Sequence, residues 1–222
     1  MPMRVFSVVP LALVLSACAG SRPEAAGPTL TAPGTVLAYR VTDAPATYPF
    51  VVTVTQNDAA GTAFAYDLAD GQSAGTVRMS AAARDSAPGG MLNAFGSEDY
   101  DLTDRTSVWM ARDDARRLQA GEQVTIRDGE GGYTFEIVGC DMPFAVAGAG
   151  TVATCRYTSP VDPEAIAAYQ DLCDEGDADS CAEAEALARD GAAYIVALDD
   201  ADEPLILDMQ TAEFRVTLQG VE

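Results

Sequence analysis

The chain has 222 residues, and its 34 acidic residues outnumber its 13 basic residues to give a formal net charge of −21. This charge argues against nucleic-acid binding, because phosphate recognition needs clustered cations. Every basic residue is arginine, and both histidine and lysine are absent. The composition therefore excludes catalytic triads that use histidine and Schiff-base chemistry that uses lysine.

Residues 1–17 have the parts of a secretory signal: a single charge, at Arg4, and an apolar stretch that is too short to span a bilayer. The stretch ends in Leu15-Ser16-Ala17-Cys18, which resembles the lipobox of bacterial lipoproteins. The resemblance implies cleavage before Cys18 and acyl chains on its thiol, which anchor the protein to a membrane. The alternative is an ordinary secretory signal that happens to contain a cysteine.

The residue after Cys18 is Ala19 rather than aspartate. In bacteria with two membranes, the lipoprotein resemblance therefore favours the outer membrane, with the protein facing the periplasm. Residues 18–33 are rich in Ala, Gly, Pro, Ser and Thr and have no apolar period, so we expect a flexible tether. We expect residues 34–222 to form one domain.

Most of this domain alternates apolar and polar residues with period two, which is typical of half-buried antiparallel strands. Turn signals such as Asp-Gly separate the alternating runs. The alternation predicts strands at 36–41, 50–55, 62–68, 75–80, 106–111, 122–127, 133–138, 151–157, 193–198, 204–209 and 213–218. Short helices are predicted at 81–87 and 113–119.

Residues 161–191 differ, because the alternation stops and alanine becomes common. Asp162 followed by Pro163 predicts a helix start, Gly176 ends that helix, and Asp177 can cap a second one. This pattern predicts a helical hairpin inserted before the last strands.

Four cysteines remain besides Cys18, and an even number in an exported chain predicts two disulfides with three possible connectivities. Short spacings favour Cys140–Cys155 and Cys173–Cys181. The segment from Cys173 to Cys181, with Gly176-Asp177 between them, resembles the turn of a cysteine-rich Sel1-like repeat. That resemblance covers one repeat at most, and it implies a local disulfide across the helical hairpin.

Carboxylates are the only plausible acid–base groups in this sequence. The candidates are Glu98, Asp99 and Asp101, and the cluster from Asp199 to Glu203. A chain with 34 acidic residues contains such clusters by chance, and a solvated surface is their ordinary explanation. The cluster at 199–203 also suits loose binding of a divalent ion. The single tryptophan, Trp109, is more typical of a core than of a ligand platform.

These patterns predict an α+β fold: a mainly antiparallel sheet, as a curved sheet, half-barrel or sandwich, with an inserted disulfide-linked helical hairpin. The preferred function is a non-catalytic cell-envelope lipoprotein, held to the membrane through Cys18, that binds a partner protein or an apolar ligand. A half-barrel that holds lipid, as carrier proteins of lipoprotein transport do, is one version by analogy of fold. No cofactor, metal site or nucleic-acid partner is predicted.

Two other functions remain open. One is a carboxylate-dependent hydrolase that acts on envelope glycans, which requires two close carboxyls in a cleft and at least one raised pKa. The other is a structural spacer that docks through the helical hairpin, which requires an exposed apolar patch on that hairpin.

Overall fold

The computed structural model describes residues 29–43, 45–92, 94–128, 131–160, 163–190, 193–198, 202–211 and 214–222. The predicted signal segment, Cys18 and most of the predicted tether lie outside the described residues. Within the described part of the chain, no helix is long and apolar enough to cross a membrane.

Eleven strands form one open sheet in the order β5-β4-β3-β2-β1-β11-β10-β9-β8-β7-β6. Every pairing is antiparallel except that of β4 with β5. The strands are β1 (Val36–Asp43), β2 (Ala46–Asp58), β3 (Gly61–Leu68), β4 (Ser73–Ser80), β5 (Tyr100–Leu102), β6 (Val124–Asp128), β7 (Gly131–Val146), β8 (Gly150–Ser159), β9 (Ala193–Leu198), β10 (Ile206–Gln210) and β11 (Phe214–Val221). The predicted fold class is confirmed.

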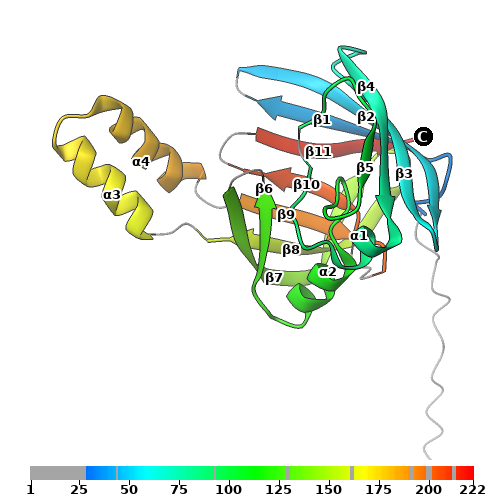
Figure 1. Cartoon of the computed structure of the whole chain (residues 1–222). Coiled ribbons are helices and arrows are strands. Elements are labelled where there is room, and N and C mark those ends of the chain that lie inside the picture. Colours follow the sequence, from blue (N-terminus) through cyan, green and yellow to red (C-terminus); the bar gives the residue numbers. More distant parts are fainter. Residues whose placement is uncertain are drawn as a thin grey trace, which may run out of the picture.

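The sheet is strongly curved (Figure 1). β7 and β11 are separated by three strands in the sheet order, yet they meet at one end. There the Ala147 amide donates to the Gln219 carbonyl at 3.3 Å, and the Val221 amide donates to the Ala147 carbonyl at 2.9 Å. The β7–β8 hairpin therefore folds back to the end of β11, and the sheet curls around a concave face.

Period-two alternation in the central strands decides which side chains enter that concave face. In β1, Leu37, Tyr39 and Val41 are buried, whereas Arg40 between them is exposed. β1 pairs with β11 and β2 in a register that places Tyr39 beside Leu218 and Phe50, which are also buried. Successive side chains of a strand point to opposite faces, so the apolar residues of neighbouring strands form one continuous layer.

Two helices and the chain around them cover the concave face (Figure 1). Helix α1 (Ala81–Ser86) follows β4 directly, and the Ser80 hydroxyl caps it by accepting from the Ala83 amide at 3.1 Å. Helix α2 (Arg112–Gln119) buries Ala115 and Leu118 against the half of the sheet formed by β6 to β9. The predicted helices at 81–87 and 113–119 are thus present.

The predicted strand at 106–111 is wrong. Thr106 and Trp109 make only isolated bridges, to Met91 and Leu205 respectively. Val108 between them has a φ of +64°, which takes the backbone out of the extended region. The short β5, which pairs in parallel with β4, was not predicted from the sequence.

The helical hairpin lies between β8 and β9 in the chain and stands clear of the sheet in Figure 1. Its helices are α3 (Pro163–Asp174) and α4 (Ala178–Asp190), joined at Gly176, which has a φ of +100°. The Asp177 carboxylate accepts from the Ser180 hydroxyl at 2.7 Å and from the Asp179 amide at 3.1 Å, as expected of a helix cap.

Both favoured disulfides are present. Cys173–Cys181 joins α3 to α4, and Cys140–Cys155 joins β7 to β8. The second one lies at an irregular stretch of β7, where the register shifts between Ile137 and Met142. This irregularity explains why alternation in the sequence located only the first half of the 16-residue strand.

A buried arginine ties the covering segments to the sheet. Arg84 of α1 is 4% exposed, and its Nη1 donates to the Asn57 side chain at 2.7 Å and to the Thr62 hydroxyl at 3.1 Å. Glu203 lies 3.9 Å from the same nitrogen and pairs with Arg112 of α2 at 2.8 Å. A charge removed from water in this way requires its partners, because an unpaired buried ion is costly.

We predict that Arg84→Ala lowers the free energy of unfolding by about 2–4 kcal/mol, because it removes two hydrogen bonds of a buried charge and leaves a cavity where the side chain packed. The measurement is the midpoint of urea denaturation. Arg78→Ala is the matched control: Arg78 forms an exposed pair with Asp101 at 3.4 Å, and its loss should cost no more than about 0.5 kcal/mol. Equal losses for the two variants would contradict a structural role for the buried arginine.

Candidate apolar binding cavity

A cavity of about 320 Å³ lies between the concave face of the sheet and the chain that crosses it. This volume falls within the range of small-ligand sites, about 300–1,000 Å³. Apart from Asp43 and Ser107, all the described residues around the cavity are aliphatic or aromatic. They are Tyr39, Val41, Tyr48, Phe50, Leu68, Met91, Leu92, Ala94, Phe95, Val108, Ile206, Met209, Phe214 and Val216.

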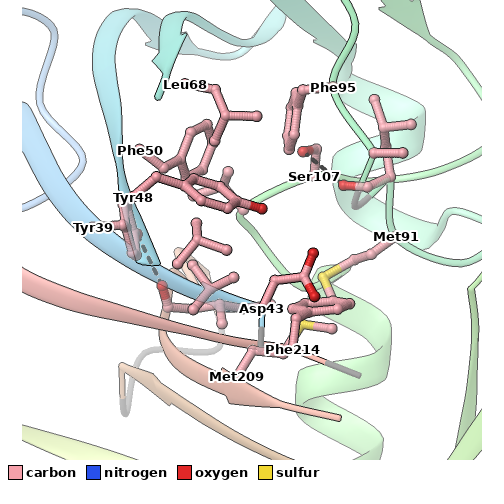
Figure 2. Close-up of a pocket in the computed structure, with 16 residues that line it drawn as sticks. Tyr39, Asp43, Tyr48, Phe50, Leu68, Met91, Phe95, Ser107, Met209 and Phe214 are labelled. Carbon is pink, nitrogen blue, oxygen red and sulfur yellow. Dashed lines mark hydrogen bonds between the residues drawn. The ribbon is translucent and has the colours of Figure 1, made fainter. Parts of the chain in front are cut away.

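The sheet supplies one wall of the cavity, through β1, β2, β3, β10 and β11. The opposite wall, which we call the roof, consists of described residues in two irregular stretches, 87–99 and 103–111, that flank β5. Figure 2 shows Phe95, Ser107 and Met91 of the roof facing Phe50, Tyr39 and Met209 of the sheet.

Phe95 fixes the roof to the sheet. Its ring centroid lies 5.0 Å from those of both Phe50 and Tyr66, in tilted contacts. The Tyr66 hydroxyl lies 2.5 Å from the Gly96 carbonyl and 2.7 Å from the Glu98 carbonyl. The ring contacts hold the roof by apolar packing, and the Tyr66 hydroxyl bonds carbonyls of an irregular backbone that makes few backbone hydrogen bonds.

Two glycines allow the roof to approach the sheet closely. A β-carbon on Gly75 of β4 would lie 2.1 Å from the Glu98 carbonyl oxygen, and one on Gly90 would lie 1.2 Å from the Arg127 carbonyl oxygen. Any side chain at these positions would push the roof outward. The two ends of the first roof stretch are therefore held against β4 and β6, with the cavity between them.

Val108 is a strained position beside the cavity. A positive φ is rare for a β-branched residue and raises the energy of the folded chain by about 1–3 kcal/mol. The Val108 carbonyl accepts from the Ile206 amide at 2.9 Å, and the Met110 amide donates to the Pro204 carbonyl at 3.0 Å. These bonds to the start of β10 hold the strained backbone in place.

The polar groups inside the cavity bond to the protein itself. The Tyr39 hydroxyl donates to the Ile206 carbonyl at 2.9 Å, and burial raises the pKa of this phenol, which keeps it neutral. The Ser107 hydroxyl donates to the Leu92 carbonyl at 3.1 Å. The deep part of the cavity therefore presents an apolar surface to any ligand.

The carboxylates singled out from the sequence lie elsewhere. Asp99 accepts from the Thr76 amide at 2.8 Å, and hydrogen bonds from the hydroxyl and amide of Thr76 hold the Asp99 pKa below its ordinary value. Asp101 pairs with Arg78 on the exposed edge of β4 and β5. The Glu98 side chain is exposed, and its carbonyl is the group that Tyr66 contacts. None of the three lines the cavity.

The structure describes only part of the acidic cluster at 199–203. Asp199 and Asp200 lie outside the described residues, whereas Glu203 belongs to the ion-pair network of Arg84 and Arg112. Asp114 of α2 has a carboxyl pKa that burial raises, but it neighbours Arg117 at 3.8 Å and does not line the cavity. Within the described part of the chain, no three His, Cys, Asp or Glu side chains converge as a metal site would require.

Trp109 is part of the core, as its pattern suggested. It is fully buried and contacts Phe64 at a centroid distance of 5.6 Å. Sequence reasoning did not identify the cavity, because its lining comes from five strands and the two stretches of the roof, which are spread along the chain. The signal that was present, apolar alternation in β1 and β11, equally suits a filled core.

The chain matches no family model, no curated protein sequence and no solved structure at a significant level.

The Asp99 hydrogen bonds predict a pH-dependent contribution to stability. Because the folded-state pKa of Asp99 lies below the unfolded value of about 3.9, its charge stabilises the fold above that value. This contribution is lost as pH falls through the folded-state pKa. Asp99→Asn should therefore lower the urea midpoint at about pH 7, and the difference from the wild type should shrink towards about pH 2.

Thr76→Val is the companion variant for this measurement, because it removes the hydroxyl donor and retains the Asp99 charge. Its pH dependence should fall between those of the wild type and Asp99→Asn. A difference between Asp99→Asn and the wild type that stays constant across the whole pH range would contradict the role given to Asp99.

Proposed function

We propose that the protein is a cell-envelope lipoprotein that binds one apolar ligand in the cavity between the sheet and the roof and performs no catalysis. The observation that carries this proposal is the chemistry of the cavity wall. Its deep surface is aliphatic and aromatic, and its two inner hydroxyls, of Tyr39 and Ser107, are already bonded to backbone carbonyls. Such a surface offers dispersion and burial to a ligand but no reactive group.

A hydrolase has less support. Among the described candidates, Asp99 and Asp101 bond partners at the sheet edge and Glu203 belongs to the ion-pair network, and none of these three lines the cavity. General acid catalysis by a carboxyl needs a raised pKa, and the pKa of Asp99 is shifted the other way.

The envelope part of the proposal has a separate basis. Leu15-Ser16-Ala17-Cys18 resembles a lipobox, and the described domain contains two disulfides. Disulfides persist in oxidising compartments such as the bacterial periplasm, and a lipid on Cys18 would hold the acidic domain at a membrane to which its own charge gives no attraction.

The docking interpretation of the helical hairpin stays a prediction. α3 exposes Tyr169 and Leu172, which are 37% and 46% accessible and lie three positions apart, on one side of the helix. Two side chains are too small a patch to specify what would cover them.

Filling the cavity tests the binding proposal. Val216 of β11 is half-buried and lines the cavity, so Val216→Phe should weaken the binding of the uncharged fluorescent probe N-phenyl-1-naphthylamine about tenfold or more, by occupying its space. Gln219→Phe, at an exposed position of the same strand, is the matched control and should bind as the wild type does. Leu92→Phe narrows the cavity from the roof and should act as Val216→Phe does.

Circular dichroism and urea denaturation would establish that each variant is folded. Folded Val216→Phe and Leu92→Phe proteins that still bind the probe at wild-type affinity would refute the cavity as the binding site. Native mass spectrometry of the domain purified from a periplasm adds the identity of any bound mass.

Replacing Cys18 tests the anchor. Cys18→Ser should move the protein from the membrane fraction to the soluble fraction and abolish partition into a detergent phase, because the thiol that carries lipid is gone. Ala19→Ser keeps the cysteine and should remain with the membrane. A wild-type protein whose intact mass shows no acyl chains would rule out the lipoprotein assignment.

A further inference from the structure

The mouth of the cavity lies at the ends of β1 and β11. Most residues around the cavity are buried or half-buried, but Asp43 and Ala94 are exposed to solvent and therefore mark the opening. Asp43 is the last residue of β1 and pairs in register with Phe214, the first residue of β11. Figure 2 shows the Asp43 carboxylate beside Phe214.

A second aromatic ring flanks Asp43 on the other neighbouring strand. Asp43 pairs with Ala46 of β2, and Tyr48, two residues further, is its diagonal neighbour on the same face. Diagonal partners across antiparallel strands lie about 7–8 Å apart, within reach of aromatic side chains. Burial and the nearby Asp43 carboxylate both raise the pKa of Tyr48, consistent with a negative potential at the mouth.

None of the described residues that line the cavity is positively charged. Asp43 is the only charged side chain among the described residues that line the cavity. The nearest arginines along the two strands are Arg40 and Arg215, which occupy the opposite phase of the alternation and so point to the convex face. Arg215 is engaged there with the Asp208 carboxylate, at 3.0 and 2.8 Å.

We propose that the ligand is a single-chain amphiphile whose head carries an ammonium group, with the head at Asp43 between Tyr48 and Phe214 and the chain in the cavity. This inference rests on the proposed function, because it needs the cavity to hold an apolar chain. A carboxylate flanked by two rings suits ammonium, through ion pairing and cation–π contact. A fatty acid carboxylate would meet a like charge at the same place.

Binding of three amphiphiles with the same twelve-carbon chain tests the head preference. The probes are dodecyltrimethylammonium, uncharged dodecyl maltoside and dodecanoate, each kept below its micelle concentration and measured by displacement of N-phenyl-1-naphthylamine. The ammonium probe should bind about tenfold more tightly than dodecanoate, a difference that matches one partly exposed ion pair with cation–π support.

Asp43→Asn should reduce that preference to less than about threefold and leave dodecyl maltoside binding unchanged, since only the charge at the mouth is altered. Asp101→Asn is the matched control: it removes the same charge from an exposed residue outside the cavity, so it reports on the net charge of the protein alone. We expect Asp101→Asn to prefer the ammonium probe over dodecanoate as strongly as the wild type does.

The outcomes separate the two proposals. If none of the three probes binds, the proposed function fails. If dodecyl maltoside binds and the ammonium probe gains nothing over dodecanoate, or Asp43→Asn and Asp101→Asn lower the preference equally, the cavity proposal stands and the ammonium site is overturned.

Discussion

An open sheet with an apolar concave face needs a cover, and in this protein much of the cover is irregular chain. The two roof stretches satisfy part of their peptide groups by bonding each other, as the Leu92 amide does with the Thr106 carbonyl at 2.7 Å, and side chains bond further carbonyls. Hydroxyls of Tyr66, Ser73 and Ser107 bond carbonyls of the roof, and Phe95 inserts its ring between Phe50 and Tyr66. A segment held at a few such points follows the sheet less closely than a helix does, and this arrangement leaves the cavity.

The roof also contributes side chains to two separate hydrophobic cores. Successive roof residues Trp109 and Met110 enter different cores, Trp109 the one over β1 to β4 and β11, and Met110 the one between α2 and the strands β6 to β9. This explains why 106–111 looked like a strand in the sequence. Its apolar residues are buried because the chain runs between two cores, with Val108 and Trp109 in one and Met110 in the other, and not because it pairs along a sheet.

Much of the fold could be predicted from the sequence, because strand alternation, helix caps and short cysteine spacings are local signals. β1, with Leu37, Tyr39 and Val41 buried around an exposed Arg40, was visible in this way. The cavity was not, since it depends on how far the roof lies from the sheet, and that distance is set by contacts such as Gly75 with Glu98 that are remote in sequence. The places of the described candidate carboxylates could not be predicted for a related reason: in an acidic chain, the few arginines and backbone amides decide what each carboxylate does. Glu203 forms an ion pair with Arg112, and Asp99 accepts a hydrogen bond from the Thr76 amide.

The residues around the cavity also show why composition cannot distinguish a binding site from a core. Val41, Phe50 and Val216 would suit either. The strained Val108 supports the proposed binding site, because a chain selected for stability alone would gain by relaxing that position. Retaining about 1–3 kcal/mol of strain beside an apolar space is costly in a marginally stable domain. The cost is understandable if closer packing would close the space, since burial of a ligand chain then restores the contacts that the sheet and the roof do not make with each other.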